Sequence, residues 1–455
     1  MLLQQVIVAV TVIPVIKGRR LIQVQKTAPL IIKLLREQVY HFSDDYRWAV
    51  YVHKVVYRNE VLLYNVLTKE LLLVEDADSD KELLVKKWFL VPELFKEQIV
   101  VNQVKSFLSV IPDKTNSINN YTIFTTTDCN ARCYYCFEQD VPKIRMNDEI
   151  VNQTIRFIKH HLTGKEISIQ WFGGEPLYNL KVINRISDEL NTNGISFSSS
   201  MTSNGYLFTH QIIKKAINNW KLKRVQITLD GTENNYNRIK SYIHKNSNPY
   251  ERVLNNIEHL LQADICVSIR LNLSLDNFQD IMNLVYHLIE RFAQYKKLTI
   301  YPHPLFDLME DEEKRRLIFE KLMIIQKVID KNHLNTEYAY FGKPRITHCK
   351  ADNNGNSVVI FPDGNIGLCD HEFAKEYIGH VSNYNINFAI IEKWRKYKEP
   401  LKSCATCLLY ADCMKLELCD TNNKCYKEFI EIDKHILEQT MINTYQKFIQ
   451  DETKI

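Results

Sequence analysis

Apolar and polar residues alternate along six short segments of the chain, the first of which begins at residue 121. The segments are YTIFTTT (121–127), EISIQWF (166–172), ISFSSSMTS (195–203), RVQITLD (224–230), CVSIRLNL (266–273) and KLTIYP (297–302). This alternation is typical of β-strands. Longer segments between them have the spacing of amphipathic helices, for example 147–162, 179–192, 209–219 and 250–263. Six strand–helix units in a row predict an α/β fold with a parallel sheet.

The alternation also separates two faces of the predicted sheet. In 224–230, Val225 and Ile227 share one face, and Gln226 and Thr228 share the other. Helices cover the apolar faces of parallel strands, so the polar faces would point into the interior of a barrel. Six units rather than eight favour a partial (β/α)6 TIM-like barrel with a polar cavity. An open doubly wound sheet with one wet face is the alternative.

The segment before residue 113 has a different pattern. AVYVHKVVY (49–57) and VLLYNVLTKELLLVE (61–75) predict strands, and SDKELLVKKWF (79–89) predicts a helix with Ser79 as its cap. The apolar run at 6–16 also predicts a strand, because eleven residues are too few to span a bilayer. The polar stretch 113–120 has the composition of a linker.

Composition narrows the class of protein. The chain has 455 residues, of which 45% are hydrophobic, so it can form more than one domain. The 58 basic and 54 acidic residues leave a net charge of +4, and no basic run indicates a nucleic-acid partner. The charges near the amino terminus follow the apolar run rather than precede it, unlike a signal peptide. We therefore expect a cytoplasmic protein with no membrane partner.

Ten of the eleven cysteines fall into two groups, Cys129, Cys133 and Cys136, and then Cys349, Cys369, Cys404, Cys407, Cys413, Cys419 and Cys425. Metal or iron–sulfur ligation explains them better than disulfides, which are rare in large chains without a signal peptide. The first group offers three thiols where a [4Fe–4S] cluster normally takes four, which leaves one iron open. A zinc site completed elsewhere and three ordinary buried cysteines are the alternatives. Cys266, alone in a strand, is predicted to be buried.

The segment CNARCYYC (129–136) resembles the signature of the radical S-adenosylmethionine (SAM) superfamily. WFGGEP (171–176) resembles the Gly-Gly-Glu motif of that family, and TSNG (202–205), TLDG (228–231) and Arg270 also come at the ends of predicted strands. The resemblance implies that the open iron binds the amino and carboxylate groups of SAM. It further implies SAM-binding roles, which are amino-group contact for Gly173, Gly174 and Glu175, carboxylate contact for Thr228 and Arg270, and ribose contact for Asn204.

The second group of cysteines is similar to the SPASM extension of radical SAM enzymes, which carries auxiliary [4Fe–4S] clusters. The resemblance implies one complete cluster on Cys404, Cys407, Cys413 and Cys425. It implies a second on Cys349, Cys369 and Cys419, with the fourth position open or filled by another group. The chain departs from the family in having five residues, MKLEL, between Cys413 and Cys419 where three are usual. A zinc-ribbon-like knob is the alternative.

The resemblance implies reductive cleavage of SAM to a 5′-deoxyadenosyl radical, which abstracts hydrogen from a substrate. A low-potential electron donor, a flavodoxin or ferredoxin, would be required. Relatives with SPASM extensions act mostly on peptides, so the expected function is a maturase of ribosomally made peptides that forms a crosslink or another modification. The alternatives are an anaerobic sulfatase-maturing enzyme, which makes formylglycine, and a non-catalytic iron–sulfur or peptide-binding protein.

Two features bear on this choice. Asp370 directly follows Cys369, where sulfatase maturases carry a catalytic base; a hydrogen-bonding role is the alternative. The segment 61–74 followed by a helix resembles the small winged-helix domains that capture leader peptides. The alternative is that this segment only covers the barrel and has a structural role.

The predicted domains are a leader-recognition-like domain (1–115), a radical SAM partial barrel (120–310), a bridging helix (311–345), a SPASM domain (346–430) and a C-terminal helix (431–455).

Overall fold

The structure, a computed structural model, covers most of the chain. It describes residues 21–22, 45–74, 81–110, 118–163, 166–244, 248–305, 310–332, 334, 349–352, 356–371, 376–413, 415–419 and 424–452. The predicted strand at 6–16 and the predicted cap Ser79 lie outside these residues. The chain forms two compact units, one made of residues 1–112, 338–349 and 396–455, and the other of residues 113–337 and 350–395.

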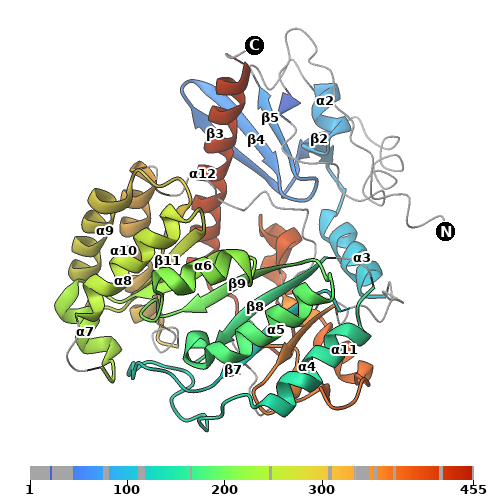
Figure 1. Cartoon of the computed structure of the whole chain (residues 1–455). Coiled ribbons are helices and arrows are strands. Elements are labelled where there is room, and N and C mark those ends of the chain that lie inside the picture. The colour runs from blue at the N-terminus through green and yellow to red at the C-terminus, as the bar shows by residue number, and fades with distance from the viewer. Residues whose placement is uncertain are drawn as a thin grey trace. The chain divides into compact units, whose positions relative to one another are not determined.

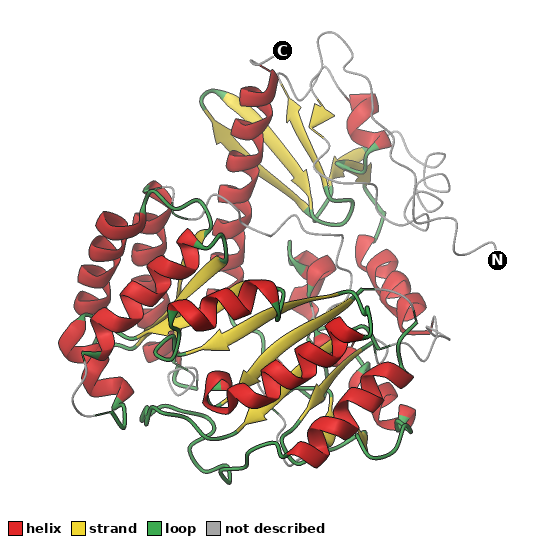
Figure 2. Ribbon diagram, viewed as in Figure 1, coloured by secondary structure: helices red, strands yellow, loops and turns green. Residues whose placement is uncertain are grey.

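A parallel sheet forms the centre of the second unit. Its six chain-ordered strands are β7 (Asn120–Thr126), β8 (Ile167–Gly173), β9 (Phe197–Ser203), β10 (Leu222–Leu229), β11 (Cys266–Leu273) and β12 (Leu298–Pro304). Each pairs in parallel with the next along the chain, which is the arrangement of a barrel wall (Figure 2). The mixed α/β fold with a partial barrel, predicted from the sequence, is confirmed.

Helices connect these strands and cover the apolar face of the sheet (Figure 1). They are α4 (Asp148–His160), α5 (Leu180–Thr192), α6 (His210–Asn218), α7 (Glu233–Lys240), α8 (Pro249–Gln262), α9 (Phe278–Phe292) and α10 (Glu312–Lys331). Several of these helices have a side-chain cap at their first turn. For example, the side chain of Asn147 accepts a hydrogen bond from the backbone N–H of Ile150, which would otherwise lack an acceptor within α4. Val225, Ile227 and Leu229 of β10 are fully buried beneath the helices.

Three further strands extend the sheet beyond β7. They are β13 (Ser357–Ile360), β14 (Asn365–Gly367) and β15 (Gly379–His380). β13 runs parallel to β7, and the other two continue antiparallel. Phe361 is fully buried and packs against Phe124 of β7, so the segment that precedes Cys369 is part of the same sheet as the barrel.

The first unit contains a separate antiparallel sheet in the order β1 (Leu21–Ile22), β5 (Glu70–Val74), β4 (Glu60–Asn65) and β3 (Val52–Tyr57). β2 (Tyr46–Trp48) pairs with β6 (Leu90–Pro92), and α2 (Lys81–Lys86), α3 (Glu97–Val110) and α12 (Lys427–Glu452) belong to the same unit. One hydrophobic core joins segments far apart in sequence; it includes Leu62, Leu71, Leu408, Leu409, Leu437 and Met441. The winged-helix comparison and the five predicted domains stay predictions.

No helix among the described residues combines the length and apolar character that a bilayer crossing needs.

Candidate functional site

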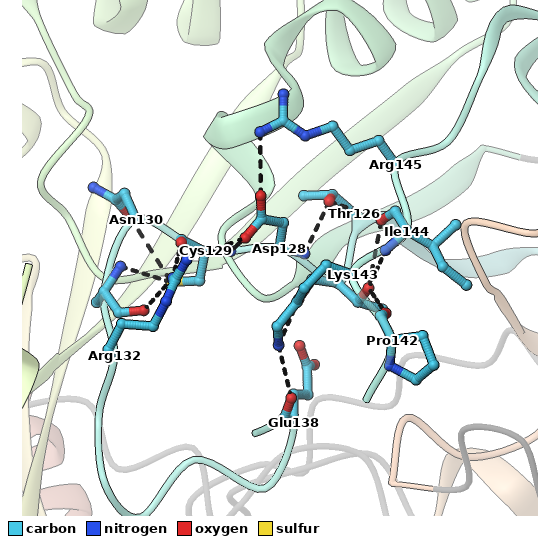
Figure 3. Close-up of polar contacts among 12 residues, drawn as sticks. Thr126, Asp128, Cys129, Asn130, Arg132, Glu138, Pro142, Lys143, Ile144 and Arg145 are labelled. Carbon is cyan, nitrogen blue, oxygen red and sulfur yellow. Dashed lines mark hydrogen bonds and ion pairs between the residues drawn. The ribbon is translucent and has the colours of Figure 1, made fainter. Parts of the chain in front are cut away.

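The first cysteine group lies on the loop that follows β7, and short polar contacts hold the start of this loop (Figure 3). The hydroxyl of Thr126 accepts a hydrogen bond from the backbone N–H of Asp128 at 2.9 Å. The carboxylate of Asp128 accepts one from the N–H of Cys129 at 2.9 Å and one from Arg145 at 3.2 Å. These contacts fix the direction in which Cys129 leaves the sheet.

Two glycines let the end of β8 approach the same loop. Gly173 has a φ of +119°, and a methyl group added there would overlap the carbonyl oxygen of Thr126. A methyl group on Gly174 would lie 2.5 Å from the carbonyl oxygen of Asp128. The N–H groups of Gly174 and Glu175 donate to these two carbonyls at 3.1 Å and 3.0 Å. Both positions therefore require glycine, because the backbones themselves are in contact.

Glu175 joins the ends of β8 and β9. Its buried carboxyl accepts hydrogen bonds from the hydroxyl of Ser203 at 2.9 Å, the N–H of Asn204 at 2.8 Å and the N–H of Leu177 at 3.1 Å. Burial raises its pKa to about 7, although these hydrogen bonds act in the opposite direction. In this structure the Glu175 side chain contacts protein groups, and the contact of Gly173, Gly174 and Glu175 with the SAM amino group stays a prediction.

Asn204 connects β9 to the cysteine loop. Its amide nitrogen donates to Asn130 Oδ1 at 2.7 Å and to the sulfur of Cys129 at 3.6 Å. The backbone N–H of Ala131 also donates to that sulfur, at 3.3 Å. Two donors directed at one sulfur suit a thiolate, the form that binds iron.

The three thiols are partly buried and lie close enough to influence one another electrostatically. Burial raises the pKa of Cys129 to about 12 and also raises those of Cys133 and Cys136, so the metal-free loop holds neutral thiols near pH 7. Bound iron would reverse this, because cluster formation displaces the thiol protons.

No group of three or more His, Cys, Asp or Glu side chains within the described ranges is arranged tightly enough to surround a single metal ion. A [4Fe–4S] cluster does not need such convergence, because each thiolate binds a different iron atom. Three cysteines on one anchored loop, with two donors on one sulfur, fit this larger group.

The predicted carboxylate-binding residues are neighbours in the sheet. Thr228 and Arg270 are register partners on β10 and β11. Burial lowers the pKa of the Arg270 guanidinium, which donates to Asn272 at 3.1 Å and contacts Nδ1 of His303 at 3.0 Å. Burial, together with Arg270, lowers the pKa of His303 to about 4, so its imidazole is neutral near pH 7. A partly buried cation therefore lies on the strand next to Thr228, and the carboxylate contact of the two residues stays a prediction.

A buried lysine that contacts the cysteine loop could not be predicted from the sequence. Lys240, the last residue of α7, forms an ion pair with Asp230 at 3.0 Å, and the two side chains are 4% and 0% exposed. Tyr135, which stands just before Cys136, donates to Asp230 at 2.6 Å and accepts from Lys240 at 3.1 Å. A lysine at a helix end ordinarily lies in solvent, so nothing in the sequence marked this one.

Asp370 lies near the first cysteine group. The neighbouring ring of His371 contacts that of Phe137, with ring centroids 5.1 Å apart. Glu138 is buried, and burial raises its pKa to about 7, with a further increase from Asp370. An acidic pair thus lies close to the cysteine loop, and the catalytic role of Asp370 stays a prediction.

The later cysteines divide between the two units. Cys404, Cys407, Cys413 and Cys425 all belong to the first unit. The pKa of Cys407 is raised by burial and then by the charges of the other three members, Cys413, Cys425 and Cys404. Cys349 and Cys419 belong to the same unit, whereas Cys369 belongs to the second. The four-cysteine group therefore lies within one unit, and both auxiliary groups stay predictions.

Comparison with known proteins agrees with this geometry. A model of the Radical SAM superfamily matches residues 123–287. The chain is 24% identical over 216 residues to the radical SAM cyclopropyl synthase TigE of Paramaledivibacter caminithermalis, covering 42% of this chain and 44% of TigE. It is 28% identical over 183 residues to a GTP 3′,8-cyclase of Clostridium perfringens, covering 38% and 54%. The chain thus spans about half the length of these relatives.

The fold is also similar to a solved structure, native anSMEcpe with bound AdoMet and the Cp18Cys peptide. The TM-score is 0.54 at 15% sequence identity, and the match covers 72% of this chain and 99% of anSMEcpe. Residues 123–287, which match the model of the Radical SAM superfamily, contain the cysteine loop, the glycine pair and strands β8 to β11, so this part of the chain is a radical SAM domain.

Proposed function

We propose that this protein is a radical SAM peptide maturase. The observation that carries the proposal is the meeting of three strand ends: Cys129 after β7, the Gly173–Gly174 pair at β8 and Asn204 after β9 are joined by hydrogen bonds. When bound, an iron–sulfur cluster and SAM together supply a carbon-centred radical that takes a hydrogen atom from the substrate. The chain contributes the cluster ligands and orients the cofactor.

Each site residue has one role in this proposal. Cys129, Cys133 and Cys136 bind the cluster, and the carbonyls of the glycine pair bind the SAM amino group. Thr228 and Arg270 bind the carboxylate, Asn204 supports the ribose and the Cys129 sulfur, and Glu175 holds the strand ends in place. Asp370 accepts a proton from the substrate. Seven of the remaining eight cysteines bind auxiliary clusters, namely Cys404, Cys407, Cys413 and Cys425 in one group and Cys349, Cys369 and Cys419 in another.

A peptide is the proposed substrate. The fold match to anSMEcpe, which was solved with a peptide bound, supports this class of substrate. The antiparallel sheet of the first unit would bind a leader sequence by adding a strand to its edge. A flavodoxin or ferredoxin would supply the electron.

A sulfatase-maturing reaction, which makes formylglycine, is the second candidate. It is favoured by Asp370, which directly follows Cys369 with the sulfur and carboxylate oxygen 3.8 Å apart. The sequence relatives named GTP 3′,8-cyclase make a nucleotide substrate a third outcome that the experiment must distinguish.

The test is anaerobic reconstitution followed by incubation with dithionite and SAM. We expect 5′-deoxyadenosine from the wild type and none from a C129A/C133A/C136A variant, with C266A as a matched control that keeps the activity. Addition of a precursor peptide encoded beside the gene should raise the yield and change the mass of the peptide. A rise with a sulfatase-derived peptide or with GTP instead would replace the proposed substrate. A wild type that makes no 5′-deoxyadenosine would show a non-catalytic protein.

A further inference from the structure

Lys240 is a buried cation that contacts Tyr135 of the cysteine loop, Asp230 directly after β10, and Tyr236 of its own helix α7. Its ammonium lies 3.0 Å from Asp230, 3.1 Å from the hydroxyl of Tyr135, and 5.8 Å and 5.9 Å from the ring centroids of Tyr135 and Tyr236. Burial alone would lower the pKa of Lys240, but attraction to Asp230 and to its neighbours raises it well above the ordinary value. The side chain is therefore charged at every working pH.

The backbone of Lys240 also holds the cysteine loop. The N–H of Arg132 donates to the carbonyl oxygen of Lys240 at 2.8 Å. Three residues further on, the N–H of Ile243 donates to the carbonyl oxygen of Asn130 at 3.0 Å. Two backbone hydrogen bonds thus connect the loop between Cys129 and Cys133 to the end of α7 and to the residues that follow it.

The charge of Lys240 lies beside the cysteine loop. Tyr135, whose hydroxyl accepts a hydrogen bond from the Lys240 ammonium at 3.1 Å, stands between Cys133 and Cys136 in the sequence. The ammonium is therefore next to the segment that carries both of these cysteines. A buried cation is poorly screened by solvent, so its field reaches any anionic group on these sulfurs. Reduction adds one negative charge to an iron–sulfur cluster, and nearby charge and hydrogen bonds set its potential.

We infer that Lys240 is a positioning residue for the first cluster: its side chain and backbone hold the loop of Cys133 through Tyr135 and Asp230, and its positive charge raises the reduction potential of that cluster. The inference rests on the proposed function, because it requires a cluster on Cys129, Cys133 and Cys136. Asp230 is the balancing anion in this arrangement. Removal of the cation and removal of the anion must therefore shift the potential in opposite directions.

The test compares K240M with D230N in anaerobically reconstituted full-length protein, using the midpoint potential of the first cluster measured by EPR-monitored redox titration. For K240M we expect the ratio of reduced to oxidised cluster at a fixed potential to fall about tenfold. This fall corresponds to a shift of the midpoint potential by about 59 mV toward more negative values for a one-electron couple. For D230N we expect a shift of similar size toward more positive values. K240R should stay within about twofold of the wild type. K214M, which removes an exposed lysine of α6, is the matched control.

A merely structural role would move K240M and D230N in the same direction, or would lower iron content in both without a shift in potential, and either result would overturn the charge assignment. The positioning role is read separately in metal-free protein, by hydrogen exchange of the Arg132 amide, which should be faster in K240M and restored in K240R. If the wild type binds no cluster, the proposed function fails, while the exchange experiment still decides whether Lys240 holds the loop. Unchanged exchange in K240M would exclude that role.

Discussion

At the scale of single residues, Gly173 shows how closely two backbones meet at the site. Its φ of +119° belongs to a region that residues with a Cβ rarely adopt, and its position faces the carbonyl oxygen of Thr126. Alanine at this position must displace either β8 or the first residues of the cysteine loop. The requirement for glycine is therefore local and steric, whatever the cofactor contributes.

We expect G173A to lower the free energy of unfolding by about 2–4 kcal/mol, from backbone strain and from a steric clash that the core cannot absorb. Iron bound by the reconstituted protein should fall as well. Gly194 provides the matched control, since its φ of +63° is also positive but an added methyl group would meet nothing within 4 Å. G194A should cost only about 1 kcal/mol and leave iron content unchanged. Equal losses in the two variants, measured by urea unfolding, would show that conformational strain alone matters.

Glu175 makes stability depend on pH with a predictable sign. Its folded pKa is raised by burial to about 7 from the ordinary value of 4.5. Between these values the folded protein retains a proton that the unfolded chain has lost. The stability that protonated Glu175 contributes is therefore fully present below about pH 4.5 and is lost as the pH rises through about 7. At about 1.4 kcal/mol per pH unit, the full effect is about 3 kcal/mol.

E175Q cannot titrate, so we expect its free energy of unfolding to change less than that of the wild type between pH 4.5 and pH 8. The difference between the two proteins should itself change by about 3 kcal/mol across this range, in urea titrations of metal-free protein. Glu138 of the cysteine loop also has a pKa raised by burial and serves as an internal check, because E138Q should remove a separate part of the dependence of stability on pH. A wild-type stability that rises with pH over this range would contradict the sign.

At the scale of elements, the six parallel strands could be predicted because each carries a two-residue alternation and is followed by an amphipathic helix. The predicted segment 224–230 and the observed β10, Leu222–Leu229, differ by two residues at the start and one at the end. The cysteine loop was also predictable, since the end of a strand fixes its position. Local pattern was sufficient wherever a segment is long and one of its faces is buried.

The same reasoning did not identify β13, β14 and β15, which have four, three and two residues. Segments this short carry little periodicity, and β13 exists because it pairs with β7, more than two hundred positions earlier in the chain. Lys240 was missed for a related reason. Its burial depends on Asp230 and Tyr135, and spacing within one helix contains no information about either partner. The short strands and the burial of Lys240 therefore depend on tertiary contacts, which local sequence patterns do not contain.

At the scale of the whole molecule, the first unit combines an early segment, residues 49–101, and a late segment, residues 404–449, in one core. Leu62, Tyr64 and Leu71 of the antiparallel sheet pack with Leu408 and Tyr410, which lie between the cysteines of the proposed auxiliary group. Cys404, Cys407 and Cys413 lie at the edge of this core, and Lys69 forms an ion pair with Asp412. A metal group on these cysteines would therefore stabilise the sheet that is proposed to bind the leader peptide.

This arrangement predicts that loss of one auxiliary ligand loosens a sheet formed more than three hundred residues earlier. We expect C407S to speed amide hydrogen exchange in β4 and β5 at least tenfold in the reconstituted protein, because metal binding to folded protein contributes directly to folding free energy. Chelation of iron from the wild type should have the same effect. C266S, in β11 of the other unit, should leave β4 and β5 unchanged. If C407S and chelation both left exchange in β4 and β5 at the wild-type rate, the shared core would hold the sheet without help from metal, and the auxiliary group would have to be explained by electron transfer alone.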